Sequence, residues 1–225
     1  MDALQRYLQS SIGKKQIVAV TGLMLIGFIL GHLAGNLLMF RGSEALNGYA
    51  HKLATMRPAL LLVELALCVV FIVHLSFTLW LLLSNTDARP VPYESYEPTE
   101  RSLSTRLMPY TGSLLAIFVL WHLFDFTFSD QTGALSVVVG KDSMGLYGVV
   151  FNAFQSSFHS GLYILAMCAI GFHLTHGFQS FLQTLGFNHP KYTPGIKVIS
   201  TLLGVAVAAL FSSIPIYVKF FASPI

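Results

Sequence analysis

The sequence has little charge for its length. Only 10% of its 225 residues are charged, against about 25% in ordinary soluble domains. Hydrophobic residues make up 54% of the chain, and the mean hydropathy is +0.67. This composition excludes an ordinary water-soluble domain and predicts an integral membrane protein.

Cysteines and nucleotide motifs are also scarce. Cys68 and Cys168 both lie inside apolar runs, so neither a disulfide framework nor a Cys-x-x-Cys-His attachment motif is available. There is no Gly-x-Gly-x-x-Gly fingerprint for a dinucleotide. The net charge of +3 is spread over short loops, which argues against a nucleic-acid partner.

Long apolar runs are what the sequence does contain. A membrane-spanning helix needs about 20 mostly apolar residues. Five stretches qualify, at roughly 15–40, 58–84, 107–128, 155–185 and 196–221. We therefore expect an all-α polytopic membrane protein, with residues 1–225 forming a single membrane domain of five transmembrane helices. The first apolar run is too long for a signal peptide, so we expect it to be retained.

The basic residues indicate an orientation. An odd number of spans places the two termini on opposite sides of the membrane. With the N-terminus inside, eight Lys and Arg residues face the cytoplasm and five face outward. The positive-inside rule thus favours a cytoplasmic N-terminus and an outer C-terminus. Residues 129–154, which are rich in glycine, become an outer loop with a short interfacial helix.

Histidines within the spans are the most informative residues. Ionisable side chains are costly in a bilayer and indicate function by default. His32, His74, His122 and His173 lie on four different predicted helices. A single buried histidine is as often a structural residue bonded to a neighbouring helix, but four such residues are harder to explain in this way.

Their depths fall into two levels. His32 lies 17 residues beyond Lys15 and His122 lies 16 beyond Arg106, so both are roughly 25 Å from the inner boundary. His74 lies 10 residues before Ser84 and His173 lies 13 before Gly186, roughly 15–20 Å from it. Two pairs at two depths match bis-histidine ligation of two b-type haems.

Other chemistries fit this pattern less well. Zinc prefers a third or fourth nearby ligand, and a di-iron site uses Glu-x-x-His motifs. A proton relay is possible but needs no matched depths. Small residues beside the histidines would leave room for a porphyrin or would equally serve close helix packing; they are Gly31, Ala34, Gly35, Gly171 and Gly177.

Further polar residues are weaker candidates. His176 follows His173 by three residues, so it could replace it as a ligand or bond a haem propionate. A quinone carbonyl needs a hydrogen-bond donor, and a redox-coupled proton needs an acceptor. Candidate quinone or propionate contacts near the outer level are His159, Asn36, Arg41 and Asp125, although interfacial polar residues of no special role look the same.

Several segments resemble a known family. They are SSIGKKQIVAVTGLMLIGFILGHLAGNLLMFRG at 10–42, NGYAHKL at 47–53, the histidine of the second span, and GFHLTHGFQSFLQTLGFNHPKY at 171–192. The chain resembles the cytochrome b membrane-anchor subunit of succinate:quinone oxidoreductases (succinate dehydrogenase and fumarate reductase), in its single-chain, five-helix, dihaem form. The resemblance covers essentially the whole chain.

The resemblance implies specific roles. It assigns His32 and His122 to an outer haem and His74 and His173 to an inner one, in line with the depths. Electrons would pass from a flavoprotein subunit and an iron–sulfur subunit through two b haems to a membrane quinone, expected to be menaquinone. The chain would be an electron-transport subunit of a tricarboxylic acid cycle enzyme in the bacterial cytoplasmic membrane, with no flavin or dicarboxylate chemistry of its own.

One position departs from the family. Some fumarate-reducing members carry a glutamate two residues before the fourth ligand for transmembrane proton movement, whereas this sequence has Gly171. The soluble partners would rest on the N-terminal segment and the 85–106 and 186–197 loops. The alternatives are a cytochrome b of another membrane oxidoreductase, a proton-coupled transporter and a haem-free anchor.

Overall fold

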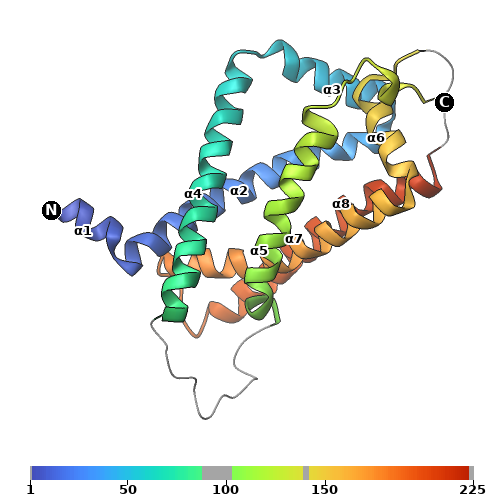
Figure 1. The fold of residues 1–225 in the computed structure, drawn as a ribbon. Coiled ribbons are helices and arrows are strands. Elements are labelled where there is room, and N and C mark those ends of the chain that lie inside the picture. Colours follow the sequence, from blue (N-terminus) through green and yellow to red (C-terminus); the bar gives the residue numbers. More distant parts are fainter. Residues whose placement is uncertain (1, 88–102, 139–141, 223–225) are drawn as a thin grey trace.

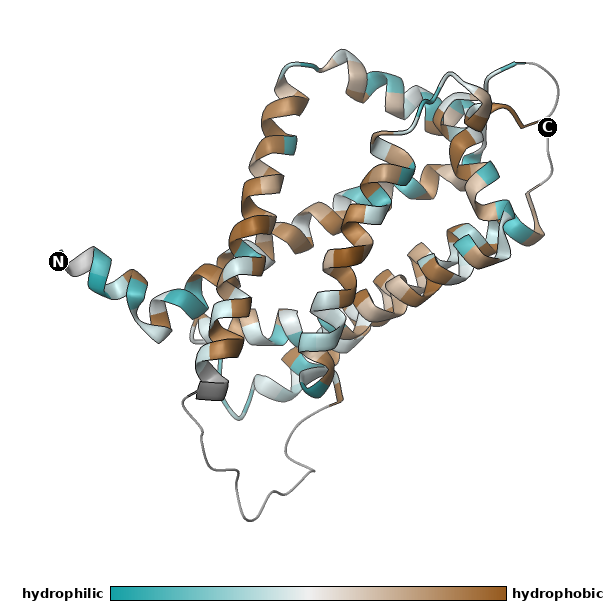
Figure 2. Cartoon of the chain, in the orientation of Figure 1, coloured by the Kyte–Doolittle hydropathy of each residue, from teal (hydrophilic) through white to brown (hydrophobic). Residues whose placement is uncertain are grey.

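The computed structural model describes residues 2–87, 103–138 and 142–222 and is almost entirely helical. Five helices are long and apolar enough to cross a membrane (Figures 1 and 2), which confirms the predicted all-α class and the predicted number of spans. These apolar helices are Ser11–Arg41, Ala59–Ser84, Leu103–Thr127, Ser157–Thr184 and Thr193–Phe220.

The chain forms eight α-helices and three short turns among its described residues. The helices are α1 (Ala3–Gln9), α2 (Ser11–Asn36), α3 (Ser43–Thr55), α4 (Ala59–Asp87), α5 (Leu103–His122), α6 (Gly145–Gln155), α7 (Ser157–Thr184) and α8 (Thr193–Phe220). The turns are two 3-10 turns, η1 (Leu37–Arg41) and η4 (Ala134–Ser136), and one π-helical turn, η3 (Leu123–Thr127).

Local signals fix the helix ends. The Ser10 side chain accepts a hydrogen bond from the Gly13 amide and so caps α2. Ser156 caps α7 in the same way through the amide of His159. Gly186 has a φ of +95°, a conformation that glycine adopts without strain just after a helix end. Helix α7 ends at Thr184, next to the predicted end of the fourth span at 185.

Helices α2, α7 and α8 form the centre of the bundle. Ile26, Leu33, Leu174 and Val207 make a buried apolar cluster between them. Helices α7 and α8 approach most closely at Gly171 and Gly204, where an added Cβ on either glycine would collide with the opposite backbone. Glycine at this crossing allows the two helices to pack closely.

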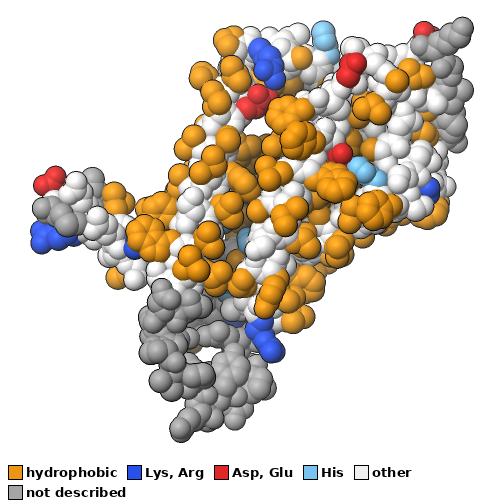
Figure 3. Space-filling model, in the orientation of Figure 1, with side chains coloured by type: hydrophobic (Ala, Val, Ile, Leu, Met, Phe, Trp, Pro, Cys, Tyr) orange, Lys and Arg blue, Asp and Glu red, His pale blue; other side chains and the backbone are white. Residues whose placement is uncertain are grey.

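Helices α4 and α5 lie on the outside of this centre. Helix α4 packs against α2, and α5 packs against α7. No residue between 59 and 84 is buried, although this stretch is the most hydrophobic of the five spans. The apolar side chains seen across the long helices in Figure 3 therefore face lipid or a partner outside the chain.

A cap of short helices covers one end of the bundle. Helices α3 and α6 pack together with the ends of α7 and α8 around Leu46, Tyr147 and Val218. The Asn47 side chain joins them, since its amide donates to the Met144 carbonyl and its oxygen accepts from the Tyr147 amide. Helix α6 is the short helix expected in the 129–154 loop, whereas α3 was not predicted.

Helix α1 and the end of α8 lie at opposite ends of the molecule in Figure 1, as five spans require. Which end faces the cytoplasm remains a prediction. The largest part of the predicted partner-binding 85–106 loop, residues 88–102, lies outside the described residues.

Candidate functional site

The four intramembrane histidines lie on four different long helices. His32 is on α2, His74 on α4, His122 is the last residue of α5, and His173 is on α7. Since α2 packs against α4 and α5 packs against α7, these helices form an α2–α4 unit and an α5–α7 unit. Each histidine pair expected from depth takes one residue from each unit.

The outer pair, His32 and His122, is in direct contact. Their ring centroids are 5.6 Å apart and their planes are nearly perpendicular, at 89°. Metal–imidazole bonds are about 2 Å long, so two rings bound to one metal from opposite sides have centroids about 6 Å apart. The observed spacing is close to that value. Phe28 stacks on His32 and Phe118 stacks on His122, which surrounds the pair with apolar rings.

In the inner pair, His74 on α4 and His173 on α7 are each held by a hydroxyl from the neighbouring helix. His74 Nδ1 lies 3.1 Å from Thr21 Oγ1 of α2, and His173 Nδ1 lies 3.3 Å from Thr111 Oγ1 of α5.

These residues fit haem better than a directly bound metal ion. Nowhere in the described ranges do three or more His, Cys, Asp or Glu side chains form a group that could hold such an ion. Paired imidazoles supply two axial ligands, and a porphyrin supplies the other four. The Cβ positions of Gly31 and Gly177 have no neighbouring atom within 4 Å, so neither glycine is needed for helix packing.

The other small residues near the histidines serve packing. A Cβ on Gly35 would lie 2.7 Å from the Tyr49 ring, which shows that α3 packs closely on α2 there. A Cβ on Gly171 would lie 2.9 Å from the Ala208 Cβ on α8. Of the two roles left open by the sequence, Gly35 and Gly171 have the packing role.

His176 has a partner of its own. Its Nδ1 lies 2.9 Å from Thr105 Oγ1 on α5, about one turn along α7 from His173. The residue therefore contacts α5, as His173 does through Thr111. A propionate contact is compatible with this position.

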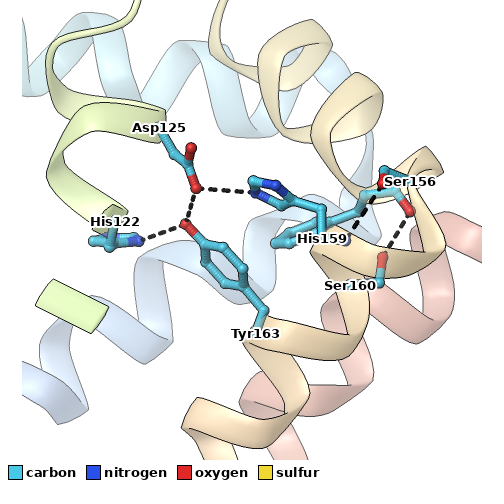
Figure 4. Close-up of polar contacts among 7 residues, drawn as sticks. His122, Asp125, Ser156, His159, Ser160 and Tyr163 are labelled. Carbon is cyan, nitrogen blue, oxygen red and sulfur yellow. Dashed lines mark hydrogen bonds and ion pairs between the residues drawn. The ribbon is translucent and has the colours of Figure 1, made fainter. Parts of the chain in front are cut away.

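A polar cluster lies beside the outer pair (Figure 4). The Tyr163 hydroxyl donates to Asp125 Oδ2 at 2.6 Å. His159 Nε2 lies 2.9 Å from the same oxygen, at an angle that makes this an ion-pair contact rather than a hydrogen bond. The Tyr163 oxygen also lies 3.4 Å from His122 Nδ1. Asp125 and His159, both predicted from sequence, are therefore linked to a candidate haem ligand.

The π-helical turn η3 follows His122 directly and carries Asp125. Such turns insert an extra residue and often occur at functional sites. Tyr163, which joins the cluster, was missed from sequence. A usable signal existed, because it lies four residues after His159 on the same face of α7.

Asn36 and Arg41 occupy other positions. The Asn36 amide donates to the His32 backbone carbonyl at 2.8 Å, so it stabilises the end of α2 beside this histidine. Arg41 lines a surface hollow together with Leu38, Glu44, Ala45 and Gly48. The structure does not bring these two side chains into the polar cluster beside the outer pair. We call this cluster, which consists of Asp125, His159, Tyr163 and His122, the Asp125 cluster.

The chain is similar to one characterised membrane protein over most of its length. It is 27% identical to the succinate dehydrogenase cytochrome b558 subunit of Bacillus subtilis (strain 168) over 205 residues, which cover 88% of this chain and 90% of the relative. No family model matches the sequence. No solved structure matches it significantly.

Proposed function

We propose that this chain is the dihaem cytochrome b membrane anchor of a succinate dehydrogenase or fumarate reductase. The observation that carries the proposal is the contact between His32 and His122, which joins the α2–α4 unit to the α5–α7 unit. The similarity to a cytochrome b558 subunit over most of both chains supports it independently.

The four histidines would hold two non-covalent b haems. His32 and His122 would be the axial ligands of the outer haem, and His74 and His173 those of the inner haem. Two bound haems at different depths supply one-electron carriers that connect the two sides of the bilayer. The protein fixes the imidazoles, excludes water with apolar side chains, and tunes the ligands through their hydrogen bonds.

The Asp125 cluster is the proposed quinone contact. Quinone reduction takes up protons together with electrons, and quinol oxidation releases them. Asp125 can accept a proton, whereas a protonated His159 can donate to a quinone carbonyl. Both side chains are partly exposed, at 21% and 18%, so a membrane-dissolved molecule can reach them. The resemblance to the family favours menaquinone, and His176 is proposed to contact an inner-haem propionate.

The partners in this proposal are a flavoprotein subunit and an iron–sulfur subunit on the cytoplasmic side. They would carry the dicarboxylate chemistry, for which this sequence has no nucleotide fingerprint. The N-terminus would lie in the cytoplasm and the C-terminus outside. Reporter fusions to each terminus test this orientation, and equal reporter activity on one side would overturn the five-span topology.

Spectroscopy of the complex isolated through a tagged chain tests the proposal. We expect a b-type difference spectrum on dithionite reduction, two haems per polypeptide, and co-purifying flavoprotein and iron–sulfur subunits. Two haems with other subunits would indicate the cytochrome b of a different oxidoreductase. A preparation without haem would overturn the proposal and favour a proton-coupled transporter or a haem-free anchor.

A further inference from the structure

The same dipeptide faces both inner histidines. Thr21 and Gly22 on α2 lie against His74, while Thr111 and Gly112 on α5 lie against His173. The two steps are on different helices and belong to different units. A third Thr-Gly step, Thr132-Gly133, lies in a loop, where the threonine bonds Asp130 instead.

The hydroxyl hydrogen bonds have a defined direction. Thr21 Oγ1 donates its proton to the Ile17 carbonyl at 2.7 Å, and Thr111 Oγ1 donates to the Leu107 carbonyl at 3.0 Å. A hydroxyl has only one proton. Each oxygen that donates to its own helix is placed to accept from the facing imidazole, which favours the tautomer with the proton on Nδ1 in both histidines.

A second acceptor on α2 agrees with this assignment. The Val18 carbonyl lies 3.2 Å from Thr21 Oγ1, so the Thr21 hydroxyl has two carbonyl acceptors on its own helix. Protonation at Nδ1 leaves Nε2, on the far side of the ring, with a free lone pair for iron.

The glycines let each ring lie against its neighbouring helix. A Cβ on Gly22 would lie 3.3 Å from His74 Cε1, and one on Gly112 would lie 3.5 Å from His173 Cε1. A methyl group could be accommodated with small shifts, but a larger side chain would move the ring. Glycine inside a helix costs about 1 kcal/mol relative to alanine, which fits a need for close approach at these positions.

We infer that the two Thr-Gly steps are paired positioning elements that set the tautomer, ring orientation and donor strength of both axial ligands of the inner haem. This inference rests on the proposed function. A hydrogen bond donated by the second ring nitrogen makes an imidazole more basic toward its metal. Ligands of this kind stabilise the ferric state and lower the midpoint potential of the haem.

The experiment replaces each threonine by valine in the intact complex, which keeps the side-chain shape and removes the hydroxyl. Redox titration and low-temperature EPR then follow each haem separately. We expect Thr21→Val and Thr111→Val each to raise the midpoint potential and shift the EPR signal of the same haem. Thr21→Ser and Thr111→Ser should restore the parent values.

Thr201→Val is the matched control, because Thr201 makes the same bond to its own helix and faces outward from α8. It should leave both haems unchanged. If a valine variant does not assemble, the alanine variant at the same position provides the same test. Unchanged haems in both threonine variants, or shifts in different haems, would overturn the inference.

The spectrum of the wild-type complex distinguishes a failure of this inference from a failure of the proposed function. A wild-type complex without two b haems would refute the proposed function itself. Two b haems in the wild type, with both threonine variants indistinguishable from it, would refute only the positioning role.

Discussion

The Tyr163 phenol donates a 2.6 Å hydrogen bond to the Asp125 carboxylate, and this bond joins α7 to the π-helical turn that follows His122. A phenol that has donated its proton can still accept one, and His122 Nδ1 lies 3.4 Å from its oxygen. A continuous polar path therefore runs from the proposed quinone contact to an outer haem ligand.

The first prediction concerns Asp125. Asp125→Asn removes the proton acceptor but keeps the size of the side chain. General acid–base groups typically contribute about 100-fold or more, so we expect succinate:quinone activity to fall by about 100-fold. The measurement is quinone reduction by the purified complex. Reduction of an artificial acceptor that takes electrons directly from the soluble subunits should be unchanged and serves as the control.

A second prediction concerns Tyr163. Tyr163→Phe keeps the aromatic packing against Phe118 and Phe154 but leaves the Asp125 oxygen without its donor. We expect both haems to be retained, quinone reduction to fall by about 10-fold, and the outer haem potential to change. If both the activity and the outer haem potential match the wild type, the Tyr163 path has no functional role.

The third prediction tests the histidine pairing. Replacing His74 or His173 by leucine should remove the inner haem and leave the outer haem spectrally present. His32→Leu or His122→Leu should have the reverse effect. Haem quantitation with EPR measures the result. Retention of both haems in the His74 and His173 variants would refute the pairing.

The fourth prediction uses a glycine of the inner site. Gly22→Leu should displace His74, because even a Cβ there would lie 3.3 Å from the ring, and the inner haem should be lost. Gly27→Leu on the same helix is the control, since its Cβ has no neighbour within 4 Å. Equal haem content in the two variants would show that Gly22 does not position the ring.

The fifth prediction concerns stability. A Cβ on Gly204 would lie 2.4 Å from the Gly171 carbonyl oxygen, so Gly204→Val should force α7 and α8 apart. Overpacking of this kind costs about 1–3 kcal/mol. We expect a lower melting temperature in detergent for Gly204→Val. Gly161→Val, which replaces a glycine with open space around its Cβ position, should melt close to the wild type.

The spans could be predicted because a bilayer demands long apolar helices whatever their neighbours are. The helix end beside Gly186 and the expected histidine depths likewise follow from local sequence, because glycine often ends a helix and each helical residue adds a fixed rise. Helix α3 was missed because it is short and amphipathic. It is stabilised by packing against α6, through contacts such as those of Asn47.

The roles of Thr21 and Thr111 could not be predicted for a related reason. Each depends on which helices are adjacent and how they are rotated about their axes, and hydropathy contains neither piece of information. The same applies to the glycines, since Gly31 and Gly35 look alike in sequence but face open space and Tyr49, respectively.

Helix α4 packs on α2 and buries none of its residues between 59 and 84. A helix that packs against the protein on one side only is held in position by whatever covers its other side. In the proposed complex that cover includes porphyrin as well as lipid, so haem would help to hold the second span in place. The amount of assembled complex would then depend on the supply of haem.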